Sequence, residues 1–171
     1  MDTKLGLGLA TGMFYHAPAG TALPTDPTAA IPAAWTHVGD VTNDGITLTM
    51  DKSVENLRNW ANVIKRVIMT EHTETIQAPL MDTTEEVLKT VLGEDNVTTV
   101  STITTVNLSA ASLPPEEAFL FVMKDGDDMM MIGCTNGQVT SVDDVTFAPE
   151  SAINWVPTIT AMGDGFQFIM K

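Results

Sequence analysis

Apolar and polar residues alternate along several short stretches of the chain. Between Ile46 and Asp51 every second side chain is apolar, so one face of the predicted strand points toward a core and the other toward solvent. An Asn43-Asp44-Gly45 turn precedes this strand, and its glycine can take a positive φ without strain. The pattern predicts that Val38 to Leu48 forms a hairpin of two short strands.

Two N-terminal segments have a composition that favours contact with another protein. Leu5, Leu7 and Leu9 alternate with glycines, which predicts an extended segment with one bare face that another backbone can approach closely. Residues 17–34 contain four prolines, which predicts a long loop rather than a helix or a central strand. Loops of this length are usually functional, so we expect residues 1–34 to act as an arm and a proline-rich loop that touch a neighbour.

The pattern from Ser53 to Ala78 has two interpretations. Apolar residues at helical spacing, with Ser53 as a possible N-cap, favour a helix over residues 53–68. Val63 to Ile68 is also rich in β-branched residues, and Thr70 to Ala78 has the composition of an exposed strand. The residues by themselves leave both interpretations open.

The clearest helix signal follows Pro79. Asp82 or Thr83 can cap the N-terminus, an apolar stripe follows, and Gly93 ends the element, which predicts a helix over residues 83–92. A helix this short is not stable in isolation in water. We therefore expect its apolar stripe to pack on a sheet.

The chain beyond residue 96 is predicted to be β structure throughout. Ala118 to Met123 is apolar on both faces, as in a central strand, and the Asn136-Gly137 pair is a strong hairpin signal. Pro157 places its strand at a sheet edge or at a bulge. The remaining predicted strands and turns are 96–108, a turn at 125–128, then 129–134, 139–147, 153–160 and 166–170. The expected fold is a single, mostly β domain over 1–171, with strands in 35–80 and 96–171.

Composition and charge restrict the classes of function that the protein can have. A chain of 171 residues can bury roughly 70% of its unfolded surface, and a hydrophobic content of 44% with 18% charged residues favours an oligomer. Eight basic residues against 22 acidic ones give a net charge of −14, which repels nucleic-acid phosphates. No apolar run is long enough to span a membrane, so we expect no membrane insertion.

The sequence contains few candidates for catalytic or metal-binding residues. Cys134 is the only cysteine and is interpreted as a small buried hydrophobe. The three histidines, His16, His37 and His72, stand in separate segments without metal-ligand spacing. No nucleophile elbow, phosphate loop or zinc motif occurs, so we expect no enzymatic activity, no metal and no cofactor.

Taken in order, these segments resemble the major tail protein, or tail tube protein, of long-tailed bacteriophages with non-contractile tails (siphovirus type). The order and spacing of the motifs carry the resemblance. They are Trp35 with Val38-Gly39-Asp40-Val41 and Asp44-Gly45-Ile46, Trp60 to Arg66, Thr73 and Thr75 ahead of Asp82-Thr83, the helix ending at Gly93, and Val139 to Ala161.

The resemblance implies an antiparallel β-sandwich or barrel with one flanking helix, whose copies form stacked hexameric rings. It implies a tail tube that delivers DNA without binding it specifically, assembled in the bacterial cytoplasm and located in the virion tail. Its other partners would be tape-measure, tail-terminator and tail-tip proteins. In this family Val63 to Ala78 would be a long strand, which limits any helix there to Ser53 to Trp60.

The resemblance also assigns candidate surfaces. The subunit-contact candidates are Leu5, Leu7, Leu9, Phe14, Tyr15, Pro24 and Pro27. The candidates for acids that line the lumen and repel DNA phosphates are Asp40, Asp44, Asp143 and Asp144. The alternative function is a monomeric β-sandwich module for adhesion or carbohydrate binding, which would need an aromatic platform or a calcium loop that the sequence does not show.

Overall fold

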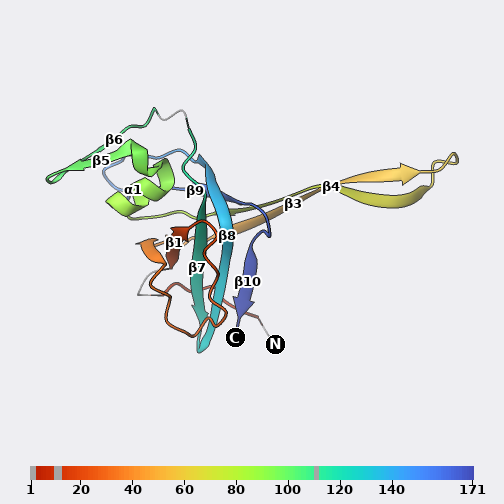
Figure 1. The fold of residues 1–171 in the computed structure, drawn as a ribbon, viewed down its shortest axis with the longest axis horizontal. Coiled ribbons are helices and arrows are strands. Elements are labelled where there is room, and N and C mark those ends of the chain that lie inside the picture. The colour runs from red at the N-terminus through yellow and green to blue at the C-terminus, as the bar shows by residue number, and fades with distance from the viewer. Residues whose placement is uncertain (1–2, 10–12, 110–111) are drawn as a thin grey trace.

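The computed structural model describes residues 3–9, 13–109 and 112–171, and in this part of the chain one large antiparallel sheet carries the fold. The strands are β1 (Phe14–Pro18), β2 (Thr36–Gly39), β3 (Thr47–Arg58), β4 (Ile64–Gln77), β5 (Val97–Val100), β6 (Ile103–Val106), β7 (Glu117–Asp125), β8 (Asp128–Val142), β9 (Pro157–Ala161) and β10 (Gln167–Met170). The large sheet has the order β2-β1-β7-β8-β9-β4-β3, with β10 paired to β8, and β5 and β6 form a separate hairpin (Figure 1). One α-helix, α1 (Glu85–Leu92), lies beside the sheet. The predicted fold class, mostly β with antiparallel strands and one helix, is confirmed.

The strand β7 is buried on both faces, as its sequence predicts. One face of β7 carries Phe119 and Phe121, which pack with Phe14 of β1 and with α1; the Phe14 and Phe121 rings stack with centroids 4.5 Å apart. The other face carries Leu120 and Val122, which pack with Trp35 and with the proline-rich loop. The sheet is therefore covered by the helix on one side and by the loop on the other.

The helix α1 begins two residues later than the predicted range of 83–92. Its N-cap is Thr84, whose Oγ1 accepts a hydrogen bond from Val87 N at 3.3 Å, and not Asp82 or Thr83. Those two side chains bind other segments: Asp82 accepts from the backbone N of Asp40, and Thr83 accepts from the indole of Trp155. The predicted end at Gly93 is confirmed, with φ of 94° and its N–H donating to Lys89 O.

The ambiguous region is a long hairpin, and the expected helix over Ser53 to Trp60 is wrong. β3 and β4 pair with each other along their whole length, which confirms the strand over the second half of this region. Register shifts at Ser53/Val54 and at Leu57/Arg58 leave Thr70 and Lys65 of β4 without a partner on β3, which breaks the period of two in β4. The turn is closed by Asn59, whose Oδ1 accepts a hydrogen bond from Val63 N at 2.9 Å.

Two predicted hairpin turns have a different role in the structure. The Asn43-Asp44-Gly45 turn forms, with a φ of 72° at Gly45, but β2 pairs with β1 and β3 pairs with β4, so Val38 to Leu48 is not a hairpin. Asn136-Gly137 lies inside β8 and makes no turn. Gly137 is needed there for packing, because a Cβ would lie 2.9 Å from the sulfur of Cys134. The predicted turn at residues 125–128 is confirmed.

The strand β9 is not at an edge, although Pro157 suggested this as one possibility. It lies between β8 and β4, and Pro157 is its first residue. The other predicted possibility for Pro157 was a bulge. The register between β8 and β9 does shift close to Pro157, between Val139 and Ser141 of β8. The run 96–108 is divided into β5 and β6 by a turn in which Ser101 has a φ of 60°.

We expect Phe14→Ala to lower the free energy of unfolding by about 3–5 kcal/mol, because it removes a fully buried ring from the centre of the core. Trp60→Ala, at a fully exposed position, is the control and should change it by less than about 0.5 kcal/mol. Urea unfolding of the monomer measures both. Equal losses in the two variants would contradict the described core.

Candidate assembly surfaces

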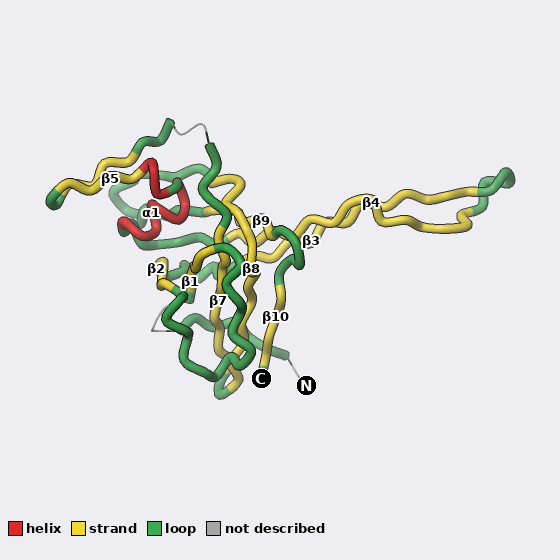
Figure 2. The backbone as a smooth tube through the Cα atoms, in the orientation of Figure 1, coloured by secondary structure: helices red, strands yellow, loops and turns green. Residues whose placement is uncertain are grey.

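One uncovered surface is the outer part of the β3–β4 hairpin, residues 50–74, which we call the hairpin arm. β4 pairs with β9 only through Thr75, Ile76 and Gln77, so beyond this point the two strands pair only with each other. Figure 2 shows both strands leaving the body of the molecule and ending in a turn far from it. The large apolar side chains exposed on the arm are Met50, Val54, Leu57, Trp60, Val63, Ile64, Val67 and Met69. An isolated two-stranded hairpin is marginally stable in water, and apolar patches of this kind mark interaction surfaces.

The end of the hairpin arm, residues 56–70, also differs in charge from the rest of the protein. It contains Arg58, Lys65 and Arg66 and no acidic residue, a net charge of +3. The remainder of the chain has five basic and 22 acidic residues, a net charge of −17. We call residues 56–70 the arm tip.

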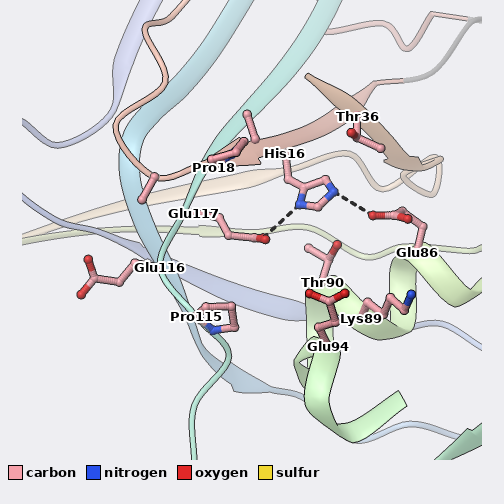
Figure 3. A pocket seen from close by; sticks show the side chains of 12 residues that line it. His16, Pro18, Thr36, Glu86, Lys89, Thr90, Glu94, Pro115, Glu116 and Glu117 are labelled. Carbon is pink, nitrogen blue, oxygen red and sulfur yellow. Dashed lines mark hydrogen bonds and ion pairs between the residues drawn. The ribbon is translucent and has the colours of Figure 1, made fainter. Parts of the chain in front are cut away.

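A second candidate surface surrounds His16 of β1, where the ring lies between two carboxylates (Figure 3). Nδ1 is 3.1 Å from Glu117 Oε2 on β7, and Nε2 is 2.8 Å from Glu86 Oε1 on α1. Burial lowers the pKa of His16, but the hydrogen bonds and charges of Glu117 and Glu86 outweigh it, so the pKa is raised from 6.5. When protonated, the ring donates to both carboxylates and ties the helix to the sheet.

The cavity beside His16 has a volume of about 560 Å³, and we call it the acidic pocket. Glu86, Glu94, Glu116 and Glu117 contribute carboxylates to its lining. Lys89 also lines it, but its Nζ is 2.8 Å from Glu85 Oε1. Thr90 is 4% exposed, and its Oγ1 has no hydrogen-bond partner among the described residues. The pocket therefore has the polarity to accept a cationic group.

Possible metal ligands, the cysteine thiol and the length of the helices can be assessed in the described residues. No group of three or more His, Cys, Asp or Glu side chains in this part of the chain is placed to hold a metal ion. Burial raises the pKa of the Cys134 thiol to about 11, so the thiol is neutral near pH 7. In the same residues, no helix has the length and apolar character needed to cross a membrane.

The predicted N-terminal contact residues lie partly on the surface. Leu5 and Leu7 are exposed, and Leu9 is half-buried against the core beneath the proline-rich loop. Leu7 forms a two-way bridge with Lys124, with N···O distances of 3.0 and 2.8 Å. The expected bare face is occupied within the chain, because the Met123 sulfur lies close to Gly6 and the Met13 sulfur close to Gly8.

The other predicted contact residues face their own chain. Phe14 is 0% exposed and Pro27 is buried, so we correct their assignment as subunit contacts: both are interior residues. Tyr15 and Pro24 are half-buried. The proline-rich loop covers its own sheet, since Leu23 and Ile31 of this loop pack on the second core cluster. The composition of the loop predicts that it is irregular, but it does not indicate that the apolar residues of the loop cover a face of the large sheet.

All four predicted lumen acids are exposed, and the fold brings them to one end of the sheet. Bridges from Leu80 to Val41 and to Trp155 join the segments next to Asp40 and Asp44 with those next to Asp143 and Asp144. Asp143 accepts a hydrogen bond from Gln77, the last residue of β4, at 2.6 Å. Asp40 Oδ1 lies 3.6 Å from Nε2 of the exposed His37.

Neither the hairpin arm nor the acidic pocket is found by the sequence reasoning. The helical spacing of apolar residues favours a helix over the first strand of the arm. The three basic residues between positions 56 and 70, with no acidic residue among them, are the one local pattern that distinguishes the arm tip. The pocket joins residues from β1, α1 and the start of β7, which are far apart in sequence. No local pattern marks such a site.

A closed core with apolar strands that stand uncovered outside it is typical of a protein that binds other protein surfaces. Residues 7–171 match the family model described as phage tail tube protein, and the chain belongs to that family. It is a structural protein of a phage tail and hence a component of the virion.

The comparisons with individual proteins are distant. One similar solved structure is described as the anti-feeding prophage cap (AFP tube terminating cap), with 11% sequence identity and a TM-score of 0.48, covering 100% of this chain and 97% of that one. A comparison with curated protein sequences found no match.

We expect His16→Gln to lower the free energy of unfolding by about 1–2 kcal/mol at pH 6, because it removes a charged ring that binds two carboxylates. The folded pKa lies above 6.5, so this stabilisation is complete below about pH 6.5 and is lost as the pH rises through the folded value. The difference between wild type and variant should therefore shrink by pH 9. His37→Gln, at an exposed site, is the control, and urea unfolding across this pH range is the measurement. A difference that does not depend on pH would contradict the assignment of a charged His16.

Proposed function

We propose that this protein assembles into hexameric rings that stack into the tube of a non-contractile phage tail, through which DNA is delivered to the host. The observation that carries the proposal is the uncovered hairpin arm. Its apolar side chains gain free energy only when another surface covers them, at about 25 cal/mol per Å² of apolar area removed from water. Membership of the tail tube family supports other copies of the same chain as that surface.

The length of the hairpin arm suits contacts between subunits. The nine residues of β3 that belong to the arm, residues 50–58, span roughly 30 Å at about 3.3 Å each. An arm of this length can cross a neighbouring subunit in the same ring or reach into the next ring. Closing a ring also covers the strands at the edges of each sheet, which would otherwise pair at random.

The acids at one end of the sheet support a role for that end in the lumen. Asp40, Asp44, Asp143 and Asp144 are exposed, and carboxylates repel the phosphates of passing DNA, so that it slides without specific binding. Leu5 and Leu7 remain candidates for contacts between copies, because their side chains are exposed. Tape-measure, terminator and tip proteins would bind the ends and interior of such a tube, which would be assembled in the host cytoplasm.

The first test removes the hairpin arm. Replacing residues 51–73 by Asn-Gly joins Met50 to Glu74, which are paired across the hairpin, and leaves the core untouched. We expect the shortened protein to unfold like the wild-type monomer but to form no rings or tubes. Negative-stain electron microscopy and sedimentation velocity measure assembly. If the wild-type chain stays monomeric under every assembly condition, the proposed function is wrong; tubes formed by the shortened chain would exclude the arm as the assembly element.

The second test concerns the lumen acids. Asp143→Lys combined with Asp144→Lys should leave tubes intact and slow DNA ejection several-fold, because lysines bind the phosphates that carboxylates repel. Asp127→Lys, in the turn between β7 and β8 at the opposite end of the sheet, is the control. Ejection kinetics of phages that carry each variant provide the measurement. Unchanged kinetics in the double variant would show that these acids do not line the DNA path.

A further inference from the structure

The arm tip is a preformed cationic element whose three charges form no ion pair with a carboxylate of the described residues. Its turn is closed by hydrogen bonds from Asn62 N to Asn59 O and from Arg58 Nη1 to Asn62 O, both 2.9 Å. Arg58, Lys65 and Arg66 form no ion pair with any described carboxylate, whereas three lysines of the body do. Such a fixed turn loses little entropy when it binds, and Trp60 and arginine are side chains that commonly dominate interfaces.

The acidic pocket has complementary properties. Glu94 and Glu116 are exposed and form no ion pair within 4 Å among the described residues. The nearby cation Lys89 pairs with Glu85, and the hydrogen bond from Lys89 to Glu85, with a smaller contribution from the charge of Glu94, raises the pKa of Lys89. Glu116 accepts a hydrogen bond from Asn136 at 3.1 Å. The buried Thr90 Oγ1 lacks a hydrogen-bond partner there, and in Figure 3 this side chain extends from α1 toward the ring of His16. Pro18 and Pro115 supply apolar walls against which an aromatic ring or an arginine stem can pack.

We propose that the arm tip of one subunit docks in the acidic pocket of a second copy of this chain. The inference rests on the proposed self-assembly and specifies the surfaces that join two subunits. An arm cannot fill the pocket of its own chain, because α1 and β1 lie on one side of the sheet's long strands and the arm extends away on the other side (Figure 1). In the complex Lys65 or Arg66 faces the carboxylates of Glu94 and Glu116, and Trp60 packs on the apolar walls.

Charge and apolar character together favour this occupant over nucleic acid. Three cations alone also suit phosphates, but a phosphate backbone gives no apolar cover to Trp60, Val63 and Ile64, which are exposed on the arm. A pocket on the same acidic chain supplies carboxylates and apolar walls in one place. Binding of the arm tip to DNA is therefore kept as an outcome of the test.

Charge reversal with rescue is the main experiment, performed on the full chain. The tip variant carries Lys65→Glu and Arg66→Glu, and the pocket variant carries Glu94→Lys and Glu116→Lys; none of these side chains contacts His16. We expect each variant to raise the protein concentration at half-assembly by about tenfold or more, and the four-fold combination to restore it, since the charges again match. Lys52→Glu is the control for the tip and Asp127→Lys the control for the pocket.

Photo-crosslinking locates the contact directly. With benzoylphenylalanine in place of Trp60, assembled protein should crosslink to residues 16–19, 86–94 or 115–117 of another copy, as identified by mass spectrometry. Crosslinks elsewhere, or a four-fold variant that stays impaired, overturn the docking site while leaving wild-type tube formation, and so the proposed function, intact. Loss of duplex DNA binding in the tip variant without any loss of assembly would assign the tip to nucleic acid. A wild-type chain that never assembles overturns the proposed function itself, and the docking with it.

Discussion

The burial of both faces of β7 is the constraint on which the rest of the fold depends. Phe119 and Phe121 on one face require the helix α1 as a cover, and Leu120 and Val122 on the other require the proline-rich loop. A central strand with only one covered face would expose large apolar side chains to water. The short helix and the irregular loop, neither of which is stable alone, are held in place by the same strand.

The His16 cluster adds a polar connection at the margin of this layered core. Glu117 belongs to β7 and Glu86 to α1, so one ring joins the first turn of the helix to the sheet. Hydrogen bonds to charged groups are stronger than neutral ones, and here they fix the helix in orientation rather than only in distance. The acidic pocket lies beside this connection, and its carboxylates come from α1, from Glu94 just after it, and from Glu116 and Glu117 at the start of β7.

The sequence predicts elements well where one local rule decides the structure. Gly93 ends the helix because its φ of 94° is unfavourable for other residues, and residues 118–123 form a central strand because they are apolar on both faces. Prediction fails where distant residues decide. Asn136-Gly137 has the composition of a turn, but the packing of Gly137 against Cys134 and Phe119 keeps it in a strand. The arm depends on the pairing of two strands, and the pocket depends on contacts between segments that are far apart in the sequence. No short stretch of sequence contains the information that specifies either of them.

The hairpin arm also separates residues that are selected for folding from residues that are selected for binding. Because residues 50–74 pair only with each other, the free energy of folding is concentrated in the body, while the arm contributes little to it. Substitutions in β7 are therefore tested by whether the monomer folds, and substitutions in the arm by what it binds. A chain divided in this way can change the specificity of its contacts without risking its core, so two tail proteins with the same body can recognise only their own kind.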